Sequence, residues 1–222
     1  MKIIASIKKA ENVRFISHLD VQRILQRTIR RAEIPVAYSQ GFNPHPLISF
    51  ATALALGQTG DCEWIEIRLE EAIDIDEFTR RMNESFPLGL SIAFAAVADD
   101  AMPSIATLMV SADYTARTGA VLDKSLLENA ISSMLNGEIL VKKSKKQHGR
   151  KLVDAEVDIR PMVYAFEVAG CDENGTVLHI SGRQDAAGGL NVSLLLGALN
   201  EKLGISVQWN INRDKVVLNK IN

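Results

Sequence analysis

Two hydrophobic periods alternate along the first hundred residues of this chain. Segments in which every second residue is apolar predict strands with one buried face, and segments with apolar residues at every third or fourth position predict amphipathic helices. The order of the predicted elements, βαββαβ, is that of a split βαβ unit with an antiparallel sheet, the ferredoxin-like arrangement. Strands are expected over residues 2–9, 47–54, 62–70 and 90–98, and helices over residues 17–33 and 74–86.

The first of these helices carries signals at both ends. Ser17 stands where an N-cap accepts a hydrogen bond from the first turn, and Asp20, three residues later, favours the positive end of the helix dipole. Pro35 stops the helix. We therefore expect a well-defined helix whose apolar stripe lies against the core.

A second half with a similar order of elements begins after Asp99 and Asp100, where an acidic pair and Pro103 follow a completed unit. The chain is therefore expected to be an α+β protein of two ferredoxin-like units, residues 1–100 and 101–222, the second carrying a basic loop. In this half strands are expected over residues 105–116, 138–146, 157–168, 176–181, 205–210 and 216–218, helices over 123–136 and 191–203, and a hairpin turn over 172–175.

The composition is that of an ordinary globular protein, with 47% hydrophobic residues in a chain of 222. No apolar run approaches the roughly 18 residues that a membrane-spanning helix requires, and the N-terminus lacks the apolar segment of a signal peptide. The two cysteines, Cys62 and Cys171, lie far apart in the sequence. We expect a cytoplasmic protein that contacts no membrane, with both cysteines as packed thiols.

The net charge of −2 hides a segregation of charge along the chain. Residues 1–60 contain eight Lys or Arg and three Asp or Glu, whereas residues 61–100 contain three and eleven. A basic run between Lys142 and Lys151 holds six Lys or Arg. Such a run is typical of a solvated loop or of a contact with an anionic polymer, and we favour RNA. Arg160 follows on the same predicted hairpin and joins the candidate contacts.

Three arginines share one face of the first predicted helix. Arg23, Arg27 and Arg30 recur at spacings of four and three residues, opposite the apolar stripe. Guanidinium groups suit phosphates, although a row of this kind is also typical of a solvated helix face.

The segment Tyr38–Pro46 has the composition of an ordered turn. It combines Gly, two Pro, Asn, Ser and Gln with a His and two aromatic residues, a mixture that suits neither a helix nor a strand. His45 lies between two prolines, which fix its backbone and favour a positioned contact. Tyr38 and Phe42 are candidates to stack on bases beside the Arg-rich helix. The other interpretation is a rigid structural corner.

Two histidines and one carboxylate are candidates for acid–base chemistry or metal binding, namely His18, His45 and Asp20. Their spacing matches no zinc motif, and a His near a helix start more often caps or hydrogen-bonds. Before the last helix, Gly188 and Gly189 are expected to form a tight turn rather than to cradle an anion. The sequence has no Walker loop, nucleophile elbow or His-Glu-x-x-His. We therefore expect no enzyme of a familiar class, no metal and no cofactor.

The motifs of residues 14–57 resemble those of the radical-SAM-linked proteins, a bacterial family encoded beside, or fused to, cobalamin-binding radical SAM proteins. The resemblance rests on Arg14–Asp20, the Arg-rich helix, Pro35–Pro46 and Leu54–Gly57, in the family's order. The family's neighbourhood, which includes an RNase G-type ribonuclease in many bacteria, implies RNA metabolism, such as the modification of tRNA or rRNA. Two cysteines cannot hold the iron–sulfur cluster of a radical SAM enzyme, so the chain is expected to be a companion of one.

Three functions follow from these observations. The first is a non-catalytic RNA-binding accessory protein of a radical SAM enzyme, with RNA and not DNA as its ligand. The second is a protein–protein adaptor that docks a radical SAM enzyme through the acidic segment 61–100 and the turn. The third is an RNA-modifying or RNA-processing enzyme that uses His18 or His45. The expected RNA contacts are Arg23, Arg27, Arg30, Tyr38, Gln40, Phe42, Asn43, His45, Lys142, Lys143, Lys145, Lys146, Arg150, Lys151 and Arg160.

Overall fold

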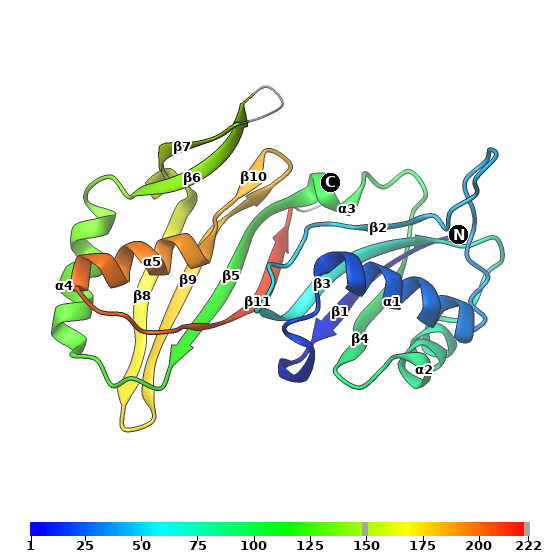
Figure 1. Cartoon of the computed structure of the whole chain (residues 1–222). Helices are drawn as coiled ribbons and strands as arrows, with labels where there is room; N and C mark the ends of the chain where they lie inside the picture. Colours follow the sequence, from blue (N-terminus) through cyan, green and yellow to red (C-terminus); the bar gives the residue numbers. More distant parts are fainter. Residues whose placement is uncertain (148–150, 220–222) are drawn as a thin grey trace. The chain divides into compact units, whose positions relative to one another are not determined.

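The computed structural model describes residues 1–147 and 151–219 (Figure 1). Its contacts divide the chain into two compact units. The first unit comprises Met1–Val110 and the C-terminal residues from Asn212, and the second comprises Ser111–Ile211. This division differs from the predicted boundary at residue 100, because the final strand returns to the first unit, where Asn212 pairs in parallel with Thr59. Both units combine helices with mostly antiparallel strands, which confirms the α+β prediction.

The first unit contains a sheet in the order β11-β3-β1-β4, with β2 also paired to β3. β1 lies antiparallel to both β3 and β4, and β2 lies antiparallel to β3. The strands are β1 (Lys2–Lys9), β2 (Ile48–Phe50), β3 (Thr59–Arg68), β4 (Leu90–Ala98) and β11 (Asn210–Leu218); the helices are the 3₁₀ turn η1 (Glu11–Val13), α1 (His18–Arg31), α2 (Ile75–Ser85) and α3 (Ile105–Leu108).

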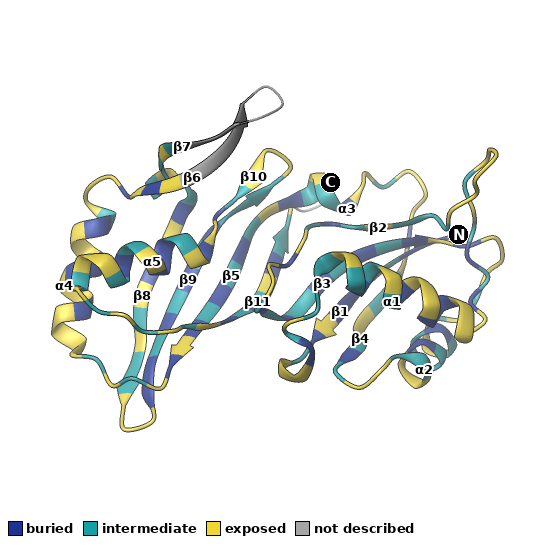
Figure 2. Cartoon of the chain, in the orientation of Figure 1, coloured by how far each residue is buried: buried dark blue, intermediate teal, exposed yellow. Residues whose placement is uncertain are grey.

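The core of the first unit lies between the sheet and the two long helices. Leu25 of α1 and Phe78 of α2 are buried together with Ile3 and Ile67, which pair across β1 and β3. In Figure 2 the outward sides of α1 and α2 are exposed, whereas the strands beneath them are largely buried. Each buried side chain of this size contributes about 1.5–3 kcal/mol, so the alternation along β1 and β3 fixes which face meets the helices.

The predicted helix boundaries in this unit are confirmed. The Ser17 hydroxyl accepts a hydrogen bond from the Asp20 backbone N–H at 3.2 Å, so Ser17 is the N-cap of α1. At the start of α2 the Asp74 carboxylate accepts from two backbone N–H groups of the first turn. These side chains satisfy donors that a helix start leaves unbonded, which is why the capping residues mark the boundaries correctly.

The second unit contains a sheet in which β9 lies between β5 and β8, antiparallel to both. A separate hairpin pairs β6 with β7, from Leu140 beside Asp158 to Gln147 beside Lys151. Its elements are β5 (Met109–Thr118), α4 (Lys124–Leu135), β6 (Leu140–Gln147), β7 (Lys151–Asp158), the 3₁₀ turn η2 (Arg160–Met162), β8 (Val163–Asp172), β9 (Gly175–Asp185), β10 (Gly188–Gly189) and α5 (Val192–Leu203).

Four predicted elements of the second half are wrong. Residues 105–108 form α3, in which the Ser104 backbone carbonyl accepts from the Thr107 N–H and from the Thr107 hydroxyl. The strand expected over 157–168 is two strands, because Pro161 lies in η2 and cannot donate to a ladder. Residues 205–209 have no regular structure, and a single strand follows them. The expected basic loop is the β6–β7 hairpin, of which residues 148–150 lie outside the described part of the chain.

None of the helices in the described ranges is both long enough and apolar enough to cross a membrane.

Candidate functional site

The predicted turn is ordered and closed at its base. Tyr38 and Pro46 form an isolated antiparallel bridge, and the Ser39 backbone N–H donates to the His45 carbonyl at 2.9 Å. At its root the turn is tied to the end of β3, because the Ala37 N–H donates to the Arg68 carbonyl at 2.8 Å. The turn is therefore a short, closed hairpin-like loop that projects from the sheet beside the end of β3.

The tip of the turn presents side chains to solvent. Phe42 is fully exposed, and its neighbours Gln40 and Asn43 are exposed as well. The bend at Gly41 has a φ of +131°, a conformation that L side chains rarely adopt. Leaving a phenyl ring in water forfeits about 1.5–3 kcal/mol of burial, so a fixed turn that displays one is a candidate recognition surface.

The imidazole of His45 is positioned by Ser39. The Ser39 hydroxyl accepts from the His45 backbone N–H at 3.1 Å and lies 2.8 Å from the ring nitrogen Nδ1. A hydroxyl that accepts one bond still has a proton to give, so Ser39 is able to donate to Nδ1. In that arrangement Nε2 carries the ring proton and points outward as a donor.

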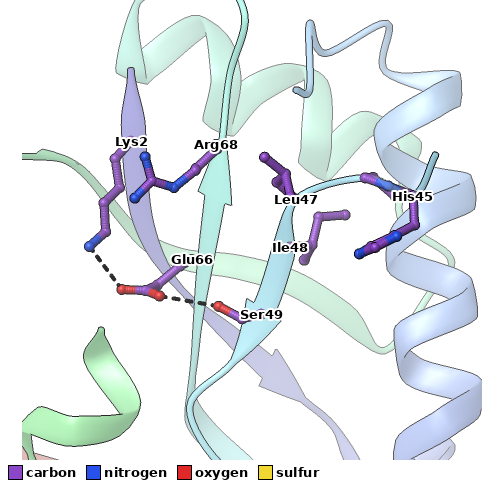
Figure 3. Close-up of a pocket in the computed structure, with 8 residues that line it drawn as sticks. Lys2, His45, Leu47, Ile48, Ser49, Glu66 and Arg68 are labelled. Carbon is purple, nitrogen blue, oxygen red and sulfur yellow. Dashed lines mark hydrogen bonds and ion pairs between the residues drawn. The ribbon is translucent and has the colours of Figure 1, made fainter. Parts of the chain in front are cut away.

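His45 lies on the rim of a groove in the first unit, shown in Figure 3. The groove has a volume of about 220 Å³ and is open to solvent. Its lining residues come from β1, β2, β3 and the turn: Lys2, His45, Pro46, Leu47, Ile48, Ser49, Glu66 and Arg68. The groove therefore joins the predicted turn to charged residues that the sequence did not single out.

The wall of the groove is a polar network centred on Glu66. Lys2 Nζ lies 3.1 Å from the Glu66 carboxylate, and the Ser49 hydroxyl donates to the same group at 3.1 Å (Figure 3). The Ile105 N–H at the start of α3 also donates to it at 2.9 Å, and Lys2 donates to the Met102 carbonyl. This network is satisfied within the chain, so it stiffens the wall instead of offering a free charge.

The groove therefore offers two cationic or donor groups toward solvent, Arg68 and His45. Arg68 is exposed and its guanidinium lies 3.6 Å from the carboxylate of Asp100, an exposed pair that contributes little. Leu47 and Ile48 lie between these two donors in Figure 3, and an apolar surface flanked by donors suits a flat, polar-edged group such as a nucleobase.

The row of arginines on α1 is exposed as predicted. Arg23 donates to Asp20 at 2.9 Å, so part of its charge is already neutralised. For Arg27 and Arg30 no ion pair is found among the residues that the structure describes. Arg27 and Arg30 are therefore the members of the row best suited to bind an anion.

His18 and Asp20 lie at the start of α1. The ring of His18 packs edge-on against Phe50 at 5.0 Å, and burial is the main cause that lowers the pKa of His18. The nearby cations of Lys9 and Arg213 lower this pKa further, whereas Glu63 opposes the shift. The Ser17 hydroxyl, and then Arg23, lower the pKa of Asp20 by donating to its carboxylate. Within the described ranges, no cluster of three His, Cys, Asp or Glu residues fits a metal ion.

A buried group of charges near His18 was missed in the sequence. Arg213 donates to Glu63 through Nε at 2.8 Å and through Nη2, and both side chains are nearly inaccessible. Lys9 donates to the Arg14 and Gln58 carbonyls at 2.9 and 3.1 Å. A signal was available, because Lys9 and Glu63 share the inward alternation of the apolar residues on their strands.

The basic residues of the second unit that were predicted to contact RNA divide into three groups. Lys142 is exposed, with Glu156 opposite it in the register of the hairpin. Arg160 is held by the fold, because its guanidinium donates to the Leu135 and Val163 carbonyls at 2.6 and 2.9 Å. The structure does not describe the side chains of Lys143, Lys145, Lys146 and Lys151. Arg150 lies outside the described residues altogether.

Two smaller predictions concern the glycine pair and the cysteines. Gly188 and Gly189 form β10 after a turn in which the Asp185 carboxylate accepts from two backbone N–H groups. The tight turn therefore lies at Ala186 and Ala187, and the glycine pair expected to form it is the strand that follows. Cys62 and Cys171 are free, half-buried thiols, and burial raises the pKa of Cys62.

Comparisons with known proteins give a family and a fold. A family model described as an uncharacterized protein conserved in bacteria (DUF2344) matches residues 2–191. Among curated proteins no sequence matches the chain. A chain from the crystal structure of a Cbf5-Nop10-Gar1 complex is similar in fold, with a TM-score of 0.51 and 9% sequence identity over 96% of this chain. Our chain spans 48% of that solved chain, so the likeness concerns the fold alone.

Proposed function

The chain belongs to the uncharacterized bacterial family DUF2344, and from this premise we propose that it is a non-catalytic RNA-binding protein that acts beside a radical SAM enzyme. One observation carries the proposal: an ordered turn holds Phe42 fully exposed at its tip and sets His45 on the rim of the groove. A partner with flat rings and hydrogen-bonding edges satisfies both residues, and unstacked RNA bases have both properties.

The charge around this turn supports an anionic ligand. Arg27 and Arg30 are exposed on α1, and Arg68 stands on the groove rim. Stacking on aromatic side chains combined with phosphate contacts from arginine is the usual way in which proteins bind single-stranded RNA. We leave Arg160 out of the proposed surface because backbone carbonyls occupy its guanidinium.

The radical SAM partner is proposed from the resemblance of residues 14–57 to the radical-SAM-linked proteins. With Cys62 and Cys171 as its only cysteines, this chain lacks the thiolates for an iron–sulfur cluster, so a partner would supply that chemistry. The proposed setting is the modification of tRNA or rRNA in the bacterial cytoplasm.

Substitution of Phe42 tests the RNA proposal. The full chain, freed of nucleic acid, is titrated with labelled single-stranded RNA of mixed sequence at low salt. Phe42→Ala is expected to raise Kd about tenfold, because stacking on one aromatic ring contributes about 1–3 kcal/mol. Tyr164→Ala removes an exposed ring from β8 of the second unit and serves as the matched control. Equal Kd values for wild type and Phe42→Ala would remove the turn from the RNA site.

A protein adaptor is the second candidate, favoured by a separate observation. Phe15, Leu19 and Leu56 are exposed apolar residues, and a Cβ at Gly57 would lie 3.7 Å from the Phe15 ring. Purification of the tagged protein from its host with and without ribonuclease separates the two functions. A radical SAM protein retained through ribonuclease treatment supports the adaptor, whereas a defined RNA lost on treatment supports the RNA-binding protein.

The enzyme hypothesis has less support. His18 is half-buried against Phe50, and His45 is held by Ser39 on an open groove. If the host phenotype of a deletion is rescued equally by wild type, His18→Gln and His45→Gln, neither histidine is catalytic.

We also propose that each unit is a ferredoxin-like split βαβ module. In the first unit the order β4-β1-β3-β2 places β3 between the parallel strands β1 and β2, which supports this assignment. In the second unit β9 lies between β5 and β8, with α4 in the connection and the β6–β7 hairpin as an insertion. An experimental structure of the full chain tests both assignments.

A further inference from the structure

The groove beside the turn has a hydrogen-bonding polarity that its own side chains set. The Ser49 hydroxyl gives its proton to Glu66 at 3.1 Å, so its oxygen is left to accept from a ligand (Figure 3). Ser39 is able to donate to Nδ1 of His45, which leaves Nε2 as a donor. The guanidinium of Arg68 only donates. The groove therefore presents two donors and one acceptor.

The guanidinium of Arg68 is available to a ligand. The side chain is 51% exposed, and Asp100 approaches its Nη1 at 3.6 Å, which is too far for a hydrogen bond. Among the described residues, no other side chain forms a hydrogen bond or an ion pair with this guanidinium. The parallel N–H groups of Nε and Nη2 therefore remain for a ligand with two adjacent acceptors.

Arg68 and Ser49 face the groove from neighbouring strands. Ser49 pairs with Glu66 in the register of β2 and β3, and Arg68 lies two residues beyond Glu66 on the same face of the sheet. Such diagonal neighbours are about 7–8 Å apart, and a flat ring system can bridge this gap with a hydrogen bond at each end. Leu47, whose carbonyl accepts from the Arg68 N–H at 3.0 Å, adds apolar surface beside them.

The charges around the groove favour a neutral ligand over a phosphate. Lys2 is neutralised by Glu66 at 3.1 Å, and Asp100 offsets part of the charge of Arg68. A phosphate would also set its oxygens against the Ser49 oxygen with no proton between them. A nucleobase is uncharged and carries both donors and acceptors on its edges.

We propose that this groove selects guanine from single-stranded RNA, an inference that rests on the proposed function. N7 and O6 of guanine are adjacent acceptors that match the two parallel N–H groups of Arg68. The N1–H and the amino group on the next edge of the same base are donors that the Ser49 oxygen can accept.

The other bases match this polarity less well. Adenine carries an amino group where guanine carries O6, so a donor would meet the donors of Arg68. Uracil has no two adjacent acceptors. Cytosine has two, N3 and O2, but its amino group lies on the same edge as these acceptors, and its single ring does not bridge the gap to Ser49.

Short adenosine RNAs with one variable central base test the inference on the full chain freed of nucleic acid. Wild type is expected to bind the RNA with a central guanine about tenfold more tightly than the RNA with a central adenine or cytosine, because one bidentate base contact discriminates by about this factor. Replacing the guanine by 7-deazaguanine, which lacks the N7 acceptor, should remove most of the preference. This comparison uses wild type alone and so is independent of how any variant folds.

Arg68→Lys keeps the charge but loses the parallel N–H pair. It is expected to abolish the preference for guanine and to leave the affinity for the all-adenine RNA unchanged. Arg117→Lys, the matched control at an exposed position of the second unit, should keep the preference.

Two kinds of failure are distinguishable. If wild type binds all of these RNAs with equal affinity, or if the guanine preference survives Arg68→Lys or the 7-deaza replacement, the inference is overturned and RNA binding stands. If wild type binds none of the RNAs, the inference falls together with the proposed function.

Discussion

At the scale of single residues, the buried ion pair of Glu63 and Arg213 makes stability sensitive to substitution. The two side chains hold the C-terminal strand against β3, and Lys9 adds a second cation beneath the same region. Burial lowers the pKa of Lys9, while Glu63 raises it. Glu63 is therefore the carboxylate on which two buried cations depend.

We predict that Glu63→Gln destabilises the protein by about 3–5 kcal/mol, because it leaves two buried cations beside a neutral amide. Urea unfolding measured by circular dichroism gives this difference. Glu77→Gln removes a carboxylate from an exposed pair with Arg80 and is expected to cost far less. A similar loss in both variants would contradict the importance of burial at Glu63.

The stability of the protein is expected to fall in acid because of His18. Burial, Arg213 and Lys9 lower its pKa in the folded chain below the unfolded value of 6.5, so the unfolded chain binds the proton first. The free energy of unfolding should therefore decrease as pH falls through about 6.5 toward the lower folded pKa. His18→Gln should remove this part of the pH dependence, measured by urea unfolding from about pH 7.5 to about pH 5. His179→Gln, the control, should not.

Which residues could be predicted from sequence depended on whether their partners are local. The Ser17 hydroxyl accepts from the N–H of Asp20, three residues later, and the Ser39 hydroxyl accepts from the N–H of His45, six residues later. Short-range sequence patterns were therefore sufficient to predict both features. Arg160 was expected on a surface, yet it donates to a carbonyl 25 positions away. Arg213 contacts Glu63 across 150 positions, and no local pattern specifies such a partner.

At the scale of elements, the same distinction explains which strands were found. In residues 1–98 each segment keeps one hydrophobic period, either that of a strand or that of a helix, and capping residues or prolines mark its ends. The strands and helices of this region lie close to the expected positions. In the second half of the chain, the apolar residues of α3 (at the end of the first unit) and of η2 (in the second unit) continue the pattern of the neighbouring strands. The hydrogen bond from the Thr107 N–H to the Ser104 carbonyl and the ring of Pro161 override that pattern, because each changes the local backbone hydrogen bonds.

The shape of the turn is expected to depend on Gly41. Its φ of +131° is costly for any residue with a Cβ, although no atom lies within 4 Å of the position that a Cβ would take. Gly41→Ala should therefore lower stability by about 1–3 kcal/mol through backbone strain alone. Thermal unfolding measures this loss. Gly197→Ala, at a helical site with no close atoms, is expected to be neutral or stabilising and controls for the added methyl group.

At the scale of the whole molecule, the basic residues lie in two units: Arg27 and Arg30 on α1, and the lysines of the β6–β7 hairpin in the second unit. The association constant for single-stranded RNA should fall as the salt concentration rises. The slope of its logarithm against the logarithm of salt concentration is about −0.7 for each phosphate that a cationic side chain neutralises. We predict that Arg27→Gln with Arg30→Gln makes this slope shallower by about 1.4. Arg117→Gln with Lys124→Gln removes the same charge from exposed positions of the second unit and should leave it unchanged.

Substituting Lys142, Lys143, Lys145 and Lys146 by Gln extends the measurement to the second unit. If one RNA contacts both units, the slope changes of the arginine and lysine variants should add when they are combined, because each neutralised phosphate releases its own counterion. If only the lysine variant changes the slope, the turn and α1 do not bind RNA, and the exposed Phe42 must serve a protein partner. If neither the arginine variant nor the lysine variant changes the slope, neither surface binds RNA. The protein adaptor is then the function that the exposed residues of the first unit support.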